Sequence, residues 1–183
     1  MIYGNKEGVR ESMLAQMETL YDLDLTGEVF APRELLDVLA VFTTAINREI
    51  SIYVSRSGSI LDITIGNLNS VELKDMHLRR NNRRLSMVRC IHTHPGGNPQ
   101  LSDVDISSLR AMRFDAMAAV GVLDGKATGI QAAFLGESIG GVNKVELTGV
   151  IPVNRIPQRA WMEAIEQADT EVLKGDISGT EDV

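Results

Sequence analysis

The chain has 183 residues and a formal net charge of −7, and 44% of its residues are hydrophobic. This length fits one domain with some peripheral structure, and the composition excludes a largely disordered chain. The acidic balance and the 4% of aromatic residues argue against direct nucleic-acid binding, which usually needs a basic face or stacking aromatic side chains.

The first 47 residues are predicted to form two helices that pack on the core. Apolar residues at helical spacing predict the first helix over residues 7–20. Pro32 suits the first turn of the second helix, which carries a broad apolar face and is expected to end near Asn47.

After residue 48 the hydrophobic period changes from that of a helix to that of a strand. Ile50, Ile52 and Val54 alternate with other residues, and a tight turn at 56–59 predicts a β-hairpin over residues 49–66. Further strands are predicted over residues 87–92, 116–123, 129–135 and 142–150. Further helices are predicted over residues 102–114 and from Pro157 onward. This order predicts an α+β domain with three αβα layers and a mixed sheet of about six strands.

Two features concern the cellular location. The single cysteine, Cys90, excludes an internal disulfide bond and fits a reducing compartment. No apolar run reaches the roughly 20 residues that a membrane span needs, and the N-terminus lacks the basic and apolar regions of a signal peptide. We therefore predict a cytoplasmic protein that does not contact a membrane.

A pair of histidines lies at the end of one predicted strand. His92 and His94 are two residues apart and therefore project from the same face of that strand. The Pro-Gly-rich stretch after them turns the chain sharply, so that Asp105, in the first turn of the next helix, could supply a third ligand. Two histidines and one carboxylate leave a fourth position for water, which is typical of a catalytic zinc site.

This pair, with the residues that follow it, resembles the JAMM motif of the MPN-type metallo-isopeptidases. The matching pattern is His92-Thr93-His94, seven residues, Ser102, two residues and Asp105. The strand-turn-strand run after Glu49 is also similar to the corresponding part of RadC-type proteins, which share the fold. The resemblance implies a JAMM/MPN or cytidine-deaminase-like metal domain over residues 48–150. It also implies zinc bound by His92, His94 and Asp105, with Glu49 as the general acid/base and Ser102 as a hydrogen-bond donor to the oxyanion.

Five segments carry a second resemblance over nearly the whole chain. They are Tyr3-Gly4-Asn5, Ile46-Asn47-Arg48-Glu49, Cys90-Ile91-His92-Thr93-His94-Pro95, Leu101-Ser102-Asp103-Val104-Asp105 and Arg113-Phe114-Asp115-Ala116-Met117-Ala118-Ala119. Together they look like the N-terminal extension of long HflX-type GTPases of Firmicutes, which are ribosome-associated. This resemblance implies a GTPase domain after residue 183, with residues 151–183 as a C-terminal helix and linker toward it. GTP and Mg²⁺ would bind only there, because residues 121–126 lack the full glycine spacing and the final Ser or Thr of a P-loop.

Each candidate residue also has a structural interpretation. Ser102 and Asp105 could cap a helix N-terminus, and Glu49 could be a charged strand-edge residue paired with Arg48 or Arg89. Cys90 is interpreted as a small buried apolar residue, and His77 as a structural histidine. Four arginines fit either a solvated loop or an RNA contact: Arg79, Arg80, Arg83 and Arg84.

Three functions are therefore open. The favoured one is a zinc-dependent amide or isopeptide hydrolase, whose substrate would be a peptide or isopeptide. The second is a non-catalytic regulatory or partner-docking module of a ribosome-associated GTPase, where the parent protein supplies the ribosome contact. The third is direct RNA binding through the arginines, against which the net charge of −7 argues.

Overall fold

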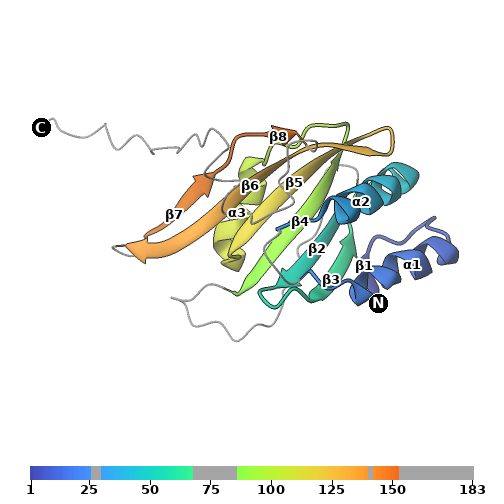
Figure 1. Cartoon of the computed structure of the whole chain (residues 1–183), viewed down its shortest axis with the longest axis horizontal. Coiled ribbons are helices and arrows are strands. Elements are labelled where there is room, and N and C mark those ends of the chain that lie inside the picture. The colour runs from blue at the N-terminus through green and yellow to red at the C-terminus, as the bar shows by residue number, and fades with distance from the viewer. Residues whose placement is uncertain (26–29, 68–85, 140–141, 153–183) are drawn as a thin grey trace, which may run out of the picture.

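The computed structural model describes residues 1–25, 30–67, 86–139 and 142–152 (Figure 1). Several sequence predictions lie outside the described residues. They concern His77, the arginines between residues 79 and 84, and the helix predicted from Pro157 onward.

One mixed sheet runs through the described protein, in the strand order β1-β3-β2-β4-β5-β6-β7, with β8 paired to β6. The strands are β1 Ile2–Gly4, β2 Ile50–Ser55, β3 Ile60–Ile65, β4 Val88–Pro95, β5 Ala116–Leu123, β6 Lys126–Ile139, β7 Val142–Leu147 and β8 Ile151–Pro152. β1 pairs with β3 and β4 pairs with β5 in parallel, whereas the other pairs are antiparallel. The predicted mixed α+β fold is therefore confirmed, but within the described residues the sheet has eight strands rather than about six. β1 and β8 were missed because strands of three and two residues are too short to display a period of two.

The helices cover both faces of this sheet. α1 (Glu11–Glu18) continues into a 3₁₀ turn, η1 (Thr19–Asp22), and α2 (Arg33–Ile46) and α3 (Asp103–Met112) follow. Figure 1 shows α2 in front of the sheet and α3 behind it. α1 begins later than predicted because Gly8 has a positive φ of 72°, which is not helical. Among the described residues, no helix combines the length and apolar character needed to cross a membrane.

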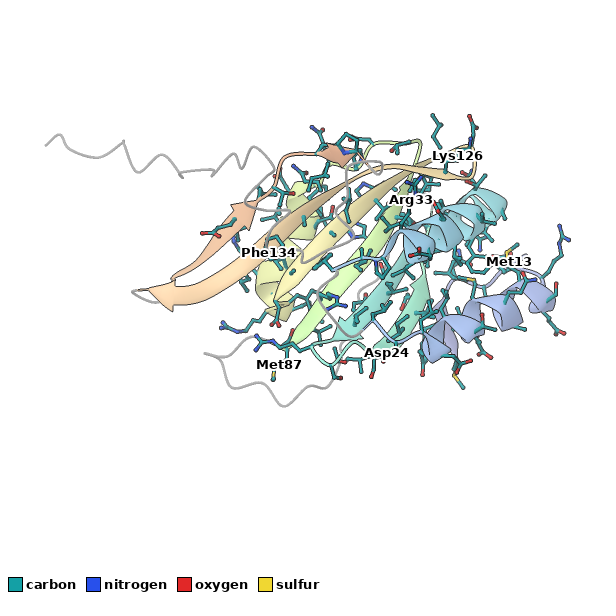
Figure 2. All side chains as sticks on the ribbon, in the orientation of Figure 1. Met13, Asp24, Arg33, Met87, Lys126 and Phe134 are labelled. Atoms are coloured by element: carbon teal, nitrogen blue, oxygen red, sulfur yellow. The ribbon has the colours of Figure 1, made fainter. Side chains whose placement is uncertain are left out.

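Each face of the sheet has its own apolar core, because successive side chains of a strand point to opposite faces. Ile50, Ile52 and Val54 of β2 join the core under α1 and α2, whereas Tyr53 joins the core under α3. The strand is consequently buried on both faces, as expected for a sheet with helices on both sides. Figure 2 shows side chains filling the space between the sheet and the helices.

The chain segment from β4 through α3 to β5 determines where polar side chains can converge. Because β4 and β5 are parallel, α3 must return the chain from the carboxyl end of β4 to the start of β5. The N-terminus of α3 is then brought back toward the end of β4. Polar groups at the carboxyl end of β4 and at the N-terminus of α3 therefore lie close together.

Candidate metal centre

His92 and His94 lie at the carboxyl end of β4, and the Nε2 atoms of both rings point toward each other. Their Nε2 atoms are 2.9 Å apart and their ring centroids are 4.7 Å apart. His92 is almost completely buried, whereas His94 is partly exposed. The sequence prediction that both imidazoles share one face of the strand is therefore confirmed.

The orientation of His94 is set by the loop that follows β4. Its Nδ1 lies 3.1 Å from the backbone carbonyl of Asn98, so Nδ1 carries the proton and Nε2 keeps its lone pair. Burial, together with the neighbouring His92, lowers the pKa of His94 and favours the neutral ring that binds metals. Gly96 and Gly97 allow the loop to turn, with φ of 92° and 85°.

Asp105 occupies the first turn of α3 and faces both histidines. Its Oδ1 lies 3.3 Å from Nε2 of His92, and its Oδ2 lies 3.9 Å from Nε2 of His94. Burial by itself would raise the pKa of this carboxyl, but hydrogen bonding and charge from His92, with hydrogen bonds from Ser102, lower it well below its usual range. Asp105 is therefore a carboxylate, the form that binds cations.

Ser102 and Asp105 also form the helix cap that the structural interpretation predicted. The Ser102 hydroxyl and backbone N–H both donate to Oδ2 of Asp105, at 2.6 and 2.8 Å, and the Asp105 N–H donates back to Oγ at 3.2 Å. This reciprocal arrangement is a capping box. Because the capping box occupies Oδ2 and leaves Oδ1 toward His92, Asp105 can cap the helix with one oxygen and still offer the other to a metal ion.

Glu49 precedes β2 directly and is buried at 7% exposure. Glu49 lies two residues ahead of Ser51, which pairs with His92 across the two antiparallel strands. Burial raises the pKa of Glu49 to about 7, and the charge of Asp105 adds to this shift while His92 opposes it. The Glu49 carboxyl thus interacts electrostatically with both His92 and Asp105.

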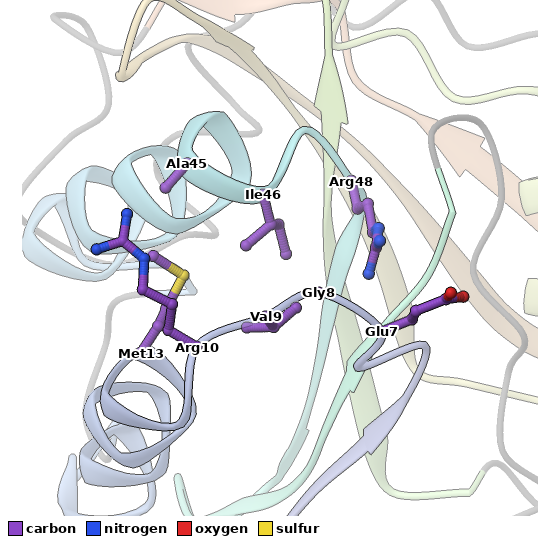
Figure 3. Close-up of a pocket in the computed structure, with 8 residues that line it drawn as sticks. All are labelled: Glu7, Gly8, Val9, Arg10, Met13, Ala45, Ile46 and Arg48. Carbon is purple, nitrogen blue, oxygen red and sulfur yellow. The ribbon is translucent and has the colours of Figure 1, made fainter.

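The described structure does not support pairing of Glu49 with either arginine. Arg48 donates to the backbone carbonyl of Asn5 at 2.9 Å, and Arg89 donates to that of Leu25 at 3.2 Å. Figure 3 shows the Arg48 side chain beside a pocket between α1 and α2. Among the described residues, Glu49 is therefore a buried carboxyl with no arginine as its ion-pair partner.

Two residues that the sequence analysis missed hold the centre in place. Thr93, between the two histidines, points to the opposite face, where its hydroxyl lies 2.6 Å from that of Thr43 and accepts from the Ile50 N–H at 3.0 Å. The alternation of β4 could have identified it as an inward polar residue. Gln131 of β6 accepts from the Leu101 N–H at 2.8 Å and so anchors the chain ahead of α3. Nothing in the sequence pattern indicates that contact.

The three candidate ligands can hold a metal ion. One ligand atom from each of His92, His94 and Asp105 lies within 4.8 Å of the other two. Two ligands of a tetrahedral zinc ion are separated by about 3.3 Å. The observed separations are 2.9 Å between the two Nε2 atoms and 3.3 Å between Nε2 of His92 and Oδ1 of Asp105, both close to this value. Cys90 is fully buried, and burial raises the pKa of its thiol, which agrees with its interpretation as an apolar residue.

Comparisons with known proteins give no assignment. No protein-family model matches the chain. No curated protein matches it either.

Proposed function

We propose that this protein is a zinc-dependent hydrolase of amide or isopeptide bonds, with its active site at the edge of the sheet where β4 ends and α3 begins. The observation that carries the proposal is the convergence of His92, His94 and Asp105 beside the buried carboxyl of Glu49. The resemblance of these residues to the JAMM motif supports the same assignment.

A bound zinc ion would lower the pKa of water to about 7 and polarise the carbonyl of the scissile bond. His92 and His94 would hold it through Nε2, and Asp105 would hold it through the oxygen that the capping box leaves toward His92. The Asn98 carbonyl and Ser102 would keep these ligands oriented, as groups that hydrogen-bond to metal ligands usually do.

Glu49 has the properties of a general acid/base. In the metal-free protein burial raises its pKa to about 7. A carboxyl beside a zinc-bound water can take a proton from that water and return it to a leaving amine. Its position at the start of a buried strand restricts its movement, because the Glu49 N–H and carbonyl both make backbone hydrogen bonds, to Asn67 and Gly66. We propose that Glu49 carries the proton between the water and the amine.

Ser102 would stabilise the oxyanion of the tetrahedral intermediate, as the resemblance implies. Its hydroxyl donates to Asp105 in this structure, so it must turn to reach an oxyanion. That turn leaves Asp105 held, because the Ser102 backbone N–H still donates to Oδ2 at 2.8 Å. The Ser102 hydroxyl can therefore bind Asp105 in the free protein and donate to the oxyanion during the reaction.

The second resemblance leads us to propose that the hydrolase forms the N-terminal part of a ribosome-associated, HflX-type GTP-binding protein. The alternative function is a non-catalytic module that docks a partner or regulates that GTPase. MPN-type domains that act as scaffolds usually lack a ligand, whereas this chain keeps every motif position. That difference favours the enzyme.

The proposal is tested with zinc-loaded protein and quenched fluorescent peptides that contain either an α-linked or a lysine ε-linked amide bond. We expect cleavage of at least one class by the wild type, and a loss of at least about 100-fold in Glu49→Gln, whose amide cannot take up the proton. The matched control is Glu49→Asp, which keeps the carboxyl and should retain measurable activity. The docking module would be supported instead if zinc-loaded wild type cleaved neither class of peptide. In that case wild type and Glu49→Gln should bind a partner equally well.

A further inference from the structure

A second cavity lies on the face of the sheet opposite the metal centre and toward the other end of β4. It has a volume of about 180 Å³. Four of its lining residues form one row across four neighbouring strands, because Val54 pairs with Arg89, Arg89 with Ala116, and Ala116 with Phe134. Arg89 and His92 are three residues apart on one strand and therefore point to opposite faces. The two sites do not share a side chain.

Among the residues that the structure describes, Arg89 is a cation without an anionic partner in this cavity. Its Nε is buried and makes no hydrogen bond, whereas its Nη2 donates to the neutral Leu25 carbonyl at 3.2 Å. Among the described residues, no carboxylate forms an ion pair with it. Burial lowers the pKa of Arg89, and no acidic side chain offsets that shift. Burying a charge without a counter-charge is costly, so proteins rarely keep one unless it has a partner.

The acidic residue of the lining is already engaged. Asp115 accepts from the Arg56 guanidinium with Oδ2 and from the Met87 backbone N–H, at 3.1 Å, with Oδ1. Both oxygens are therefore occupied at the rim of the cavity. With Arg56 and Asp115 neutralising each other, the charge of Arg89 is left as the net charge of the lining.

The walls around Arg89 are aromatic. The Arg89 guanidinium lies 5.5 Å from the centroid of the Phe30 ring, and Phe30 meets Phe134 edge-on with a centroid distance of 6.1 Å. Figure 2 shows Phe134 projecting from β6 near this end of the sheet. The cavity therefore combines apolar aromatic walls with the positive charge of the Arg89 guanidinium.

We propose that this cavity is a binding site for a small carboxylate with an apolar body, whose carboxylate accepts from the Arg89 guanidinium while its body packs against Phe30 and Phe134. The volume of about 180 Å³ is below the 300–1,000 Å³ of typical drug-sized ligand sites, so the ligand is small. A single guanidinium cation suits a monoanion, whereas a phosphate dianion usually collects more donors.

The test uses the full, EDTA-treated chain and two probes of equal shape, benzoate and its neutral analogue benzamide. Binding is followed by amide chemical shifts of Val54 and Ala116 in ¹⁵N-labelled protein. We expect saturable benzoate binding, at least tenfold weaker binding of benzamide, and at least a tenfold loss of benzoate affinity in Arg89→Met. The His94→Ala control should bind benzoate as the wild type does, because the metal centre is not involved.

Arg89→Met keeps an apolar stem of similar length and removes the unpaired charge, so its melting temperature should equal or exceed that of the wild type. If this variant does not fold, Ala116→Val decides the question, since it fills the cavity and leaves Arg89 in place. That variant should also lose benzoate binding at least tenfold. No saturable binding, equal affinities for benzoate and benzamide, unchanged affinity in a folded Arg89→Met or in Ala116→Val, or loss of binding in His94→Ala would overturn the proposal.

Discussion

Nε2 of His92 lies 2.9 Å from Nε2 of His94, although the two residues are separated by Thr93 on the same strand. At this distance both nitrogens cannot carry a proton, because two N–H donors would face each other. Either one proton is shared between the rings or a cation lies between the lone pairs. The hydrogen bond from Nδ1 of His94 to the Asn98 carbonyl favours the arrangement in which His94 offers its lone pair.

The first prediction concerns a metal ligand. His94→Ala removes one of the three proposed ligands and should weaken zinc binding at least about 100-fold, a loss larger than that typical for groups behind the ligands. His94 is partly exposed, so this variant should keep the fold, which circular dichroism and thermal unfolding can verify. Zinc affinity is measured by competition with a chromophoric chelator. An affinity within a factor of three of the wild type would remove His94 from the centre.

The second prediction concerns Ser102, which holds Asp105. Ser102→Ala removes the hydroxyl of the capping box but keeps the backbone N–H that donates to Oδ2 at 2.8 Å. Loss of an N-cap hydroxyl costs about 0.5–2 kcal/mol of stability, and loss of a group that orients a ligand costs about 10–100-fold in metal affinity. Urea unfolding and zinc titration measure the two effects. Ser102→Thr is the matched control, because it keeps the hydroxyl and should restore both quantities.

The third prediction is a pH dependence that comes from the burial of Glu49. Its pKa is raised from 4.5 to about 7, so between these values the folded state holds the proton more tightly than the unfolded state. The associated stability is therefore present below pH 4.5 and is lost as the pH rises through 7. Above pH 7 the metal-free Glu49→Gln variant, which has no charge to bury, should be more stable than the wild type by about 1–3 kcal/mol.

This difference is measured by urea unfolding in EDTA at pH 4.5 and at pH 8. The two proteins should have similar stability at the lower pH and differ at the higher one. A difference that does not change with pH, or one that favours the wild type at pH 8, would show that Glu49 is not a buried carboxyl with a raised pKa.

The fourth prediction concerns Thr93, which supports the metal centre without being one of its proposed ligands. Thr93→Val leaves the Ile50 N–H and the Thr43 hydroxyl without their buried partner, which should cost about 1–3 kcal/mol of unfolding free energy. Thr93→Ser keeps the hydroxyl and should recover most of that loss. Denaturant unfolding of the three proteins provides the measurement, and equal stability of the Val and Ser variants would contradict the assigned role.

The ligand cluster could be predicted from the sequence because it depends on local rules. The i, i+2 spacing on a strand places His92 and His94 on one face, and a serine three residues ahead of an aspartate marks the start of a helix. The position of Glu49 could be predicted only in part, since its distance from the histidines depends on the register between β2 and β4.

Other features depend on contacts that no short pattern encodes. β1 was missed because its three residues form a strand only by pairing with β3, 61 positions away in the chain at Ile2 and Ile63. The contact of Gln131 with Leu101 joins β6 to the loop before α3. The lack of an acidic partner for Arg89 among the described residues can be seen only when its surroundings are known. The resemblances to the JAMM motif and to HflX-type proteins stay predictions.

The central claim is that His92, His94 and Asp105 form a zinc site. It is tested most directly by measuring the metal content of the protein by mass spectrometry after purification without chelator and dialysis against zinc. The account predicts about one zinc ion per wild-type chain and almost none in the His92→Ala, His94→Ala and Asp105→Ala variants. A wild-type chain without stoichiometric zinc, or variants that retain it, would contradict the account.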